Sequence, residues 1–147
     1  MTITDRLTIT KESISEMTNE EIDHAIAIEV MGWKIIHDKN YCESVGAYLY
    51  VDKNGNTHFL RYDRPNVYSG EIKFSPSTEF SQTWRVVERM REKKFGFSLV
   101  AALTDDTNKN IWMVIFAFGL IVEHESAPRA ICEAALMAVR ENSNEMP

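Results

Sequence analysis

The stretch that decides the fold is Ile111-Trp112-Met113-Val114-Ile115-Phe116-Ala117-Phe118, which contains no charged side chain. Side chains of a β-strand point alternately to the two faces of its sheet. Both faces of this strand are apolar, because Ile111, Met113 and Ile115 alternate with Trp112, Val114 and Phe116. A strand that is apolar on both faces has to be covered on both. The stretch therefore predicts a sheet held between two layers of helices.

The segments around this stretch predict further strands, joined by short polar turns. The pair Asn54-Gly55 is a strong hairpin signal, because both residues tolerate positive φ. Consecutive strands that are connected by short turns pair in the antiparallel direction. The expected strands are Ala47–Asp52, Thr57–Asp63, Glu71–Phe74, Phe95–Leu103 and Ile111–Phe118.

Three helices are expected between and after these strands. The first begins at Thr18, which has the spacing of a capping box with Glu21, and ends at Gly32, a residue suited to a left-handed helix end. The second opens at Ser75-Pro76 and closes in a group of arginines and lysines, which suit the negative end of a helix dipole. The third is expected over Arg129–Glu141.

A chain of 147 residues has the length of one domain. The order of the expected elements predicts an α+β fold, a three-layer α/β/α sandwich with a mostly antiparallel sheet. We expect an N-terminal arm over residues 1–17, a single domain over residues 18–141 and a flexible tail over residues 142–147.

The composition limits the class of protein. With 44% hydrophobic residues, the chain is not wholly disordered. Sixteen Lys and Arg against 22 Asp and Glu give a net charge of −6, which argues against nucleic acid as the main partner. The most apolar stretch, Ile111–Val122, is shorter than the ~20 residues of a membrane span, and residues 1–15 do not have the pattern of a signal peptide. We therefore expect a cytoplasmic protein with reduced cysteines and no membrane partner.

Three motifs, in order along the chain, resemble one known family. The first closes the first helix, the second leads into and through the second helix, and the third forms most of the third helix. They are Met31-Gly32-Trp33-Lys34; Phe74-Ser75-Pro76-Ser77-Thr78 with Trp84, Val86-Val87-Glu88 and Met90; and Ser126-Ala127-Pro128-Arg129-Ala130-Ile131-Cys132-Glu133-Ala134-Ala135-Leu136. Together they are similar to the phage ABA sandwich domain family of small bacteriophage and prophage proteins, from about Glu20 to about Arg140.

This resemblance implies an α/β/α fold and a viral origin, and it transfers no catalytic residues. A phage protein of this kind works inside the host cell, so the expected location is the host cytoplasm. The sequence departs from the common form of the family in two places. These are the longer N-terminal extension, Met1–Met17, and the elaborated segment Asp63–Lys73.

Motifs of catalysis and metal binding are missing from the sequence. It has no Gly-rich phosphate loop, no nucleophile elbow, no HExxH and no Cys-x-x-Cys, and its four histidines are scattered. We therefore expect no catalytic residues, no metal and no cofactor. The residues Met31, Trp33, Trp84 and Trp112 suggest either a stacking platform for bases or core residues, and the apolar faces on which they lie favour the core.

The best candidate for ligand contact is the segment Arg61-Tyr62-Asp63-Arg64-Pro65-Asn66-Val67-Tyr68. Guanidinium groups bind phosphates through a bidentate fork, and Tyr or Arg planes stack on a purine. A helix N-terminus near Ser126 adds backbone donors for an anion. The candidate ligand-binding residues are Arg61, Tyr62, Arg64, Tyr68, Lys73 and Arg129. The alternative is an exposed loop with ordinary surface arginines.

Three hypotheses of function follow. The first is a non-enzymatic sponge that sequesters a small anionic nucleotide signal of host antiviral defence, by analogy with other phage proteins. The second is an interaction protein that blocks a host defence protein, and the third is a hydrolase of the same signals. A homo-oligomer is expected under the first two, because signal sites are often built between subunits and the arm residues Ile3, Leu7 and Ile9 need cover.

Overall fold

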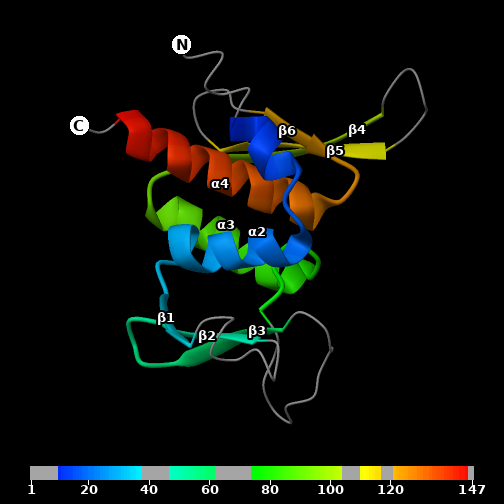
Figure 1. Ribbon diagram of the computed structural model, residues 1–147. Coiled ribbons are helices and arrows are strands. Elements are labelled where there is room, and N and C mark those ends of the chain that lie inside the picture. Colours follow the sequence, from blue (N-terminus) through cyan, green and yellow to red (C-terminus); the bar gives the residue numbers. More distant parts are fainter. Residues whose placement is uncertain (1–9, 38–46, 62–73, 104–109, 117–120, 146–147) are drawn as a thin grey trace.

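The computed structural model describes residues 10–37, 47–61, 74–103, 110–116 and 121–145. It consists of two three-stranded antiparallel sheets with the helices between them (Figure 1). The first sheet contains β1 (Lys34–His37), β2 (Ala47–Val51) and β3 (Thr57–Arg61), and the second contains β4 (Phe97–Leu103), β5 (Asn110–Phe116) and β6 (Ile121–His124). The helices are α2 (Asn19–Ala25), the π-helix η1 (Ile26–Val30), α3 (Phe80–Glu92) and α4 (Ala127–Glu145).

The first expected helix is present as α2 and η1, which follow each other directly. Its capping box is confirmed: the Glu21 amide donates to the Thr18 hydroxyl oxygen (3.1 Å), and the Thr18 amide donates to the Glu21 carboxylate (3.2 Å). Gly32 adopts φ +73°, the left-handed conformation that was expected at this helix end. The helix widens in its last turn to a π-helix, in which the Met31 amide donates to the Ile26 carbonyl.

The first sheet is built around the predicted hairpin. Strands β2 and β3 pair from Val51 with Thr57 to Ala47 with Arg61, and Gly55 in the turn adopts φ +84°. Strand β1 pairs with β2 and contains a β-bulge. Its four residues were not predicted, because a strand this short offers too few alternations to be recognised.

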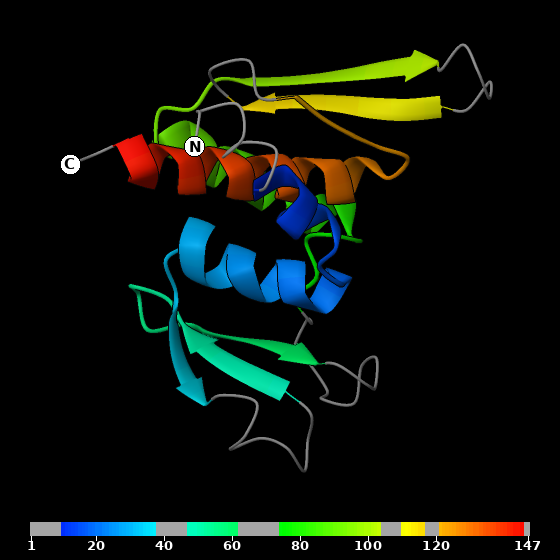
Figure 2. The same ribbon diagram turned by 45° about the horizontal axis from the view of Figure 1, so that its top comes forward.

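The second sheet contains the decisive stretch as its central strand, β5. Val114 and Phe116 are fully buried on the face that α4 covers. On the opposite face, Ile111, Met113 and Ile115 are only half-buried, and none of the described helices lies over them (Figure 2). The expectation of a helix layer on both faces of this strand is therefore wrong for the described part of the chain.

The α+β class and the antiparallel pairing are confirmed, whereas the order of the layers differs from the expectation. Instead of one sheet between helices, the helices lie between two sheets (Figures 1 and 2). The reason lies in α4, which is buried on all sides from Ala130 to Ala138, with Cys132 among these residues. A helix that is apolar all round belongs in the centre of a domain.

The expected boundaries at the two ends of the domain also differ. Residues 10–15 form a short helix that packs onto the domain, and Ile14 in it is fully buried. The described half of the expected arm is thus anchored to the core through Ile14, while residues 1–9 lie outside the described residues. At the other end, α4 continues to Glu145, into the segment that was expected to be a flexible tail. No described helix is both long enough and apolar enough to cross a membrane.

Helix α3 begins at Phe80, five residues later than expected, because residues 76–78 form a turn. This turn is held by Asp23, a buried carboxylate on α2 that accepts a hydrogen bond from the Ser77 amide (2.8 Å). Near the other end of α3, Arg89 donates to the Val30 carbonyl (3.3 Å) and Lys93 donates to the Glu29 carbonyl (3.2 Å). These two cations therefore cap the C-terminal end of η1.

Candidate binding clefts

The ligand site predicted from the sequence lies largely outside the described residues. Tyr62, Arg64, Tyr68 and Lys73 are not described, and of Arg61 only the backbone is, as the last residue of β3. The expected strand Glu71–Phe74 also lies outside them, apart from Phe74. The prediction for these five site residues therefore stays a prediction.

Arg129, the sixth predicted site residue, is described, and it is buried inside the domain. Its guanidinium pairs with Glu133 (2.9 Å) and donates to the Asn19 side-chain oxygen (3.0 Å). It also donates to the backbone carbonyls of Ile14 and Met17, which ties the N-terminal helix to α4. Because its donors bind other parts of the protein, Arg129 has a structural role, and we leave it out of the candidate site.

A cleft of about 330 Å³ lies between the β2–β3 turn and α3, and we call it the hairpin cleft. It lies at the opposite end of the hairpin from Arg61. Its lining residues come from the end of η1, the hairpin turn and the exposed side of α3. They are Met31, Gly32, Trp33, Asp52, Lys53, Asn54, Arg85, Glu88, Arg89 and Glu92.

Trp33 forms the apolar part of the hairpin cleft. Its ring stacks flat on the His58 ring, with centroids 3.9 Å apart and planes at 5°. The Arg85 guanidinium lies 5.9 Å from the Trp33 ring centroid, within range of a cation–π interaction. Trp33 itself is buried, which confirms the core interpretation for this residue.

Two of the carboxylates in the hairpin cleft already have partners. Asp52 accepts hydrogen bonds from the amides of Asn54 (2.8 Å) and Asn56 (2.9 Å), and its other oxygen lies 3.0 Å from His58 Nε2. The hydrogen bond with His58 is the main reason that the pKa of Asp52 is lowered to about 2. Glu92 pairs with Arg89 at 2.9 Å.

Arg85 and Lys53 have no carboxylate partner among the residues that the structure describes. Arg85 is exposed, and its guanidinium lies over the face of Trp33 without a hydrogen bond or ion pair within that part of the chain. Two cations without partners thus stand in the hairpin cleft beside a single unpaired carboxylate, Glu88. These two cations are the groups that an anionic ligand would contact, although the lining as a whole has three cations and three carboxylates and is formally neutral.

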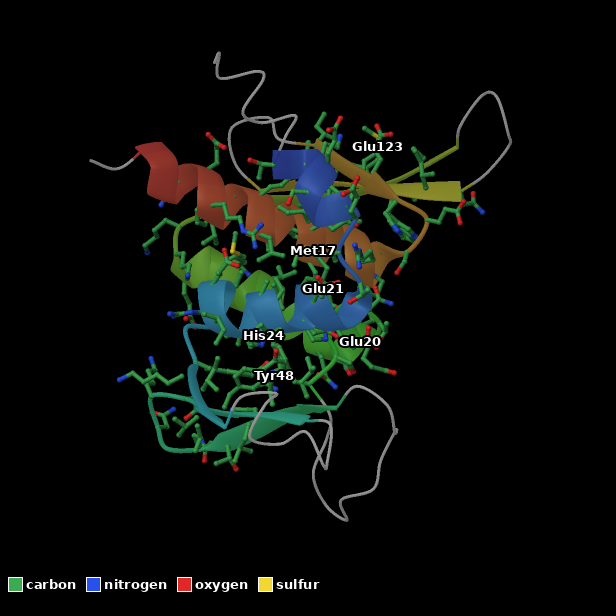
Figure 3. All side chains as sticks on the ribbon, viewed as in Figure 1. Met17, Glu20, Glu21, His24, Tyr48 and Glu123 are labelled. Atoms are coloured by element: carbon green, nitrogen blue, oxygen red, sulfur yellow. The ribbon has the colours of Figure 1, made fainter. Side chains whose placement is uncertain are left out.

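A second cleft, of about 540 Å³, lies between α2 and β2, and we call it the histidine cleft. The His24 ring stacks on Tyr48 with centroids 4.1 Å apart (Figure 3), and its Nδ1 shares a hydrogen bond with the Tyr50 hydroxyl (2.6 Å). The arginine of this cleft, Arg140, is bound by both oxygens of Glu29 at 2.8 Å. Among the described residues that line it, the histidine cleft therefore offers no free guanidinium to an anion.

The burial of His24 predicts a loss of stability at mildly acidic pH. Desolvation holds the pKa of His24 below its ordinary 6.5, and the charge of Glu29 only partly opposes this shift. Because the unfolded chain takes up the proton more readily, the contribution of His24 to the free energy of unfolding should be fully present above pH 6.5. This contribution should fall as the pH is lowered from there. Urea denaturation at pH 7.5 and pH 5.0 measures this difference. The variant His24→Phe, which keeps the ring on Tyr48, should show a smaller difference, and an equal one would contradict the prediction.

The described residues contain no group of three or more His, Cys, Asp or Glu side chains arranged to hold a metal ion. The aromatic residues divide between core and surface. Trp112 packs against the core, whereas Trp84 has 44% of its area exposed, so the core interpretation is wrong for Trp84.

Arg85 and Lys53 are not among the ligand contacts that the sequence predicts. The only sequence signal was that Lys53 stands in the predicted hairpin turn, while Arg85 is one of several arginines on a helix. Nothing in the local pattern shows that this turn and this helix meet at one cleft.

The fold and the clefts define a small α+β domain in which two antiparallel sheets enclose a layer of helices. One of its clefts contains two cationic side chains, Arg85 and Lys53, that have no carboxylate partner among the described residues. The chain belongs to the phage ABA sandwich domain family, whose model matches residues 24–136. The resemblance seen in the sequence is thus confirmed. None of the curated proteins is significantly similar to the chain. Among solved structures, the chain is similar to a phage protein from Bacillus cereus ATCC 14579. That protein is 26% identical with a TM-score of 0.47, and the match covers 84% of this chain and 93% of that one.

Proposed function

We propose that this phage-family protein is a non-enzymatic binding protein that sequesters a small anionic, nucleotide-like signal of host antiviral defence. The observation that carries the proposal is the Arg85 guanidinium, which lies over the Trp33 ring in the hairpin cleft without a carboxylate partner in the described part of the chain. Family membership adds the phage context.

The chemistry of the hairpin cleft suits such a ligand. A guanidinium binds a phosphate through two parallel hydrogen bonds, and Lys53 adds a point charge across the cleft. The planar guanidinium of Arg85, backed by Trp33, also offers a surface on which a base can stack. The volume of about 330 Å³ lies at the lower end of the range of about 300–1,000 Å³ for small-molecule pockets.

One observation supports the hydrolase alternative. Asp52, which lines the cleft, is hydrogen-bonded to His58 behind it, and a histidine held by a carboxylate is able to take a proton from water. Two contacts favour a structural role for this pair. Asp52 binds the amides of its own turn, and the His58 ring is stacked flat on Trp33. We therefore prefer binding without reaction.

The test is ligand binding with matched arginine variants. Thermal shift and calorimetry with cyclic dinucleotides, cyclic trinucleotides and ADP-ribose derivatives identify a ligand, and mass spectrometry after heat denaturation shows whether it is released intact. We expect Arg85→Gln to weaken binding at least tenfold, about 1.4 kcal/mol, because one charge-assisted phosphate contact is lost. Arg91→Gln is the matched control, since Arg91 is exposed on the same helix and does not line the cleft.

The other outcomes separate the alternatives. Release of an altered nucleotide would favour the hydrolase. If Arg85→Gln binds normally and Arg64→Ala weakens binding, the ligand site is the loop predicted from the sequence. If none of these compounds binds and a host defence protein is captured instead, the protein is a blocker and the sponge proposal fails.

A further inference from the structure

We infer that the chain forms a two-fold symmetric dimer through the open edge of β4, with a second copy of the same chain as the partner. This inference is independent of the ligand proposed above. In the second sheet, β4 pairs only with β5, so its other side is an edge within the described part of the molecule (Figure 2).

The sequence of β4 lacks the devices that keep sheet edges apart. Natural proteins protect an exposed edge with charged side chains, proline, a bulge or a covering contact, because its free N–H and C=O groups otherwise pair with another strand. The seven residues of β4, Phe-Ser-Leu-Val-Ala-Ala-Leu, contain no charge, no proline and no glycine.

The other edge strands of the described sheets carry such protection. Strand β1 contains a bulge and begins with Lys34. Strand β3 ends with Arg61. Strand β6 contains Glu123, and its Ile121 carbonyl accepts a hydrogen bond from Lys11 Nζ (3.2 Å). Among the edge strands of the described sheets, β4 is thus the one whose residues include no charged side chain.

Exposed apolar side chains lie on both sides of the β4 edge. On the outer face of the sheet, Val100 has 51% of its area exposed. On the inner face, Trp84 of α3 contacts Phe97 edge-on, with ring centroids 6.2 Å apart, and 44% of Trp84 is exposed. Phe80, one helical turn before Trp84, is 48% exposed. We call Phe80, Trp84, Val100 and the edge of β4 the β4 patch.

The symmetry of the β4 edge favours a second copy as the occupant of the β4 patch, although the net charge of the chain opposes association elsewhere on the surface. Each copy has a net charge of −6, so two copies repel each other over most approaches. The β4 patch contains no charged residue, and an antiparallel edge is complementary to itself across a two-fold axis. Two seven-residue edges with a few apolar side chains beside each form a small interface, of the size class of weak and transient complexes.

The experiment is a measurement of mass in solution with lysine variants of the β4 patch and of the first sheet. Sedimentation equilibrium at 50 µM or so should give twice the 16.9 kDa of one chain for the wild type. Val100→Lys and Trp84→Lys should weaken the dimer at least a hundredfold and give a monomer at that concentration. The matched control is Ile36→Lys, because Ile36 is 44% exposed on β1 of the other sheet, and this variant should remain a dimer.

A second measurement on the wild type needs no variant. Amide protons at the free edge of β4 should exchange more slowly as the protein concentration rises, while those of β1 should not change. The inference is overturned if the wild-type chain is monomeric at about 50 µM, or if exchange in β4 does not depend on the protein concentration. It is also overturned if Ile36→Lys breaks the dimer and Val100→Lys does not.

Discussion

Replacing Arg129 with methionine is expected to lower the free energy of unfolding by about 3–5 kcal/mol, the usual cost of removing one member of a buried ion pair. Its partner Glu133, 2.9 Å away, would be left as a buried carboxylate without a counter-charge. The carbonyls of Ile14 and Met17 would also lose their donor. Urea denaturation followed by circular dichroism measures the loss.

Two variants control for the chemistry of this substitution. Arg140→Met removes an arginine that pairs with Glu29 at a half-exposed site, and it should cost less than about 1 kcal/mol. The double variant Arg129→Met/Glu133→Leu removes the stranded charge and should recover part of the loss. If Arg129→Met is as stable as Arg140→Met, Arg129 does not hold the N-terminal helix in place.

The local elements were predictable because their signals lie within a few residues of each other. The capping box of Thr18 and Glu21, the left-handed Gly32 and the turn at Gly55 all occur where the sequence indicated. These features depend on backbone conformation and on hydrogen bonds between near neighbours. The surrounding fold has little influence on them.

The layer order was not predictable by the same means. Alternation in β5 shows that both faces are apolar, but it does not show that Val114 meets α4 while Met113 is only half-buried. An apolar strand face has the same pattern whether a helix or another chain covers it. In the described part of the chain, the second sheet therefore has an outer face on β5 that no helix covers and an edge on β4 that no strand pairs with.

The candidate site was the least predictable part. Arg129 was chosen because it stands near a helix N-terminus, and only the three-dimensional structure shows that Glu133, Asn19 and backbone carbonyls occupy its donors. Arg85 lies on the exposed side of an amphipathic helix, where an arginine is ordinary. Its position over Trp33 depends on a contact between residues 52 positions apart in the chain.

Replacing Trp33 with alanine is expected to lower the free energy of unfolding by about 3–5 kcal/mol, the range for deleting a large buried aromatic side chain. The Trp33 ring contacts His58 on β3, Phe74 and Tyr50 on β2, so it joins the first sheet to the helical layer. Removing it leaves a cavity at this junction and takes away the surface on which Arg85 lies.

Hydrogen exchange should therefore accelerate in β2 and β3 more than in β4 and β5. The control is Trp84→Ala, the same substitution at a half-exposed site, which should cost less than about 1 kcal/mol when both variants are measured at a concentration at which the chain is monomeric. If the two variants lose equal stability, or if exchange accelerates equally in both sheets, Trp33 does not hold the first sheet against the helices. If Trp33→Ala behaves as expected and also weakens nucleotide binding while Trp84→Ala does not, the hairpin cleft depends on the same ring that stabilises the fold.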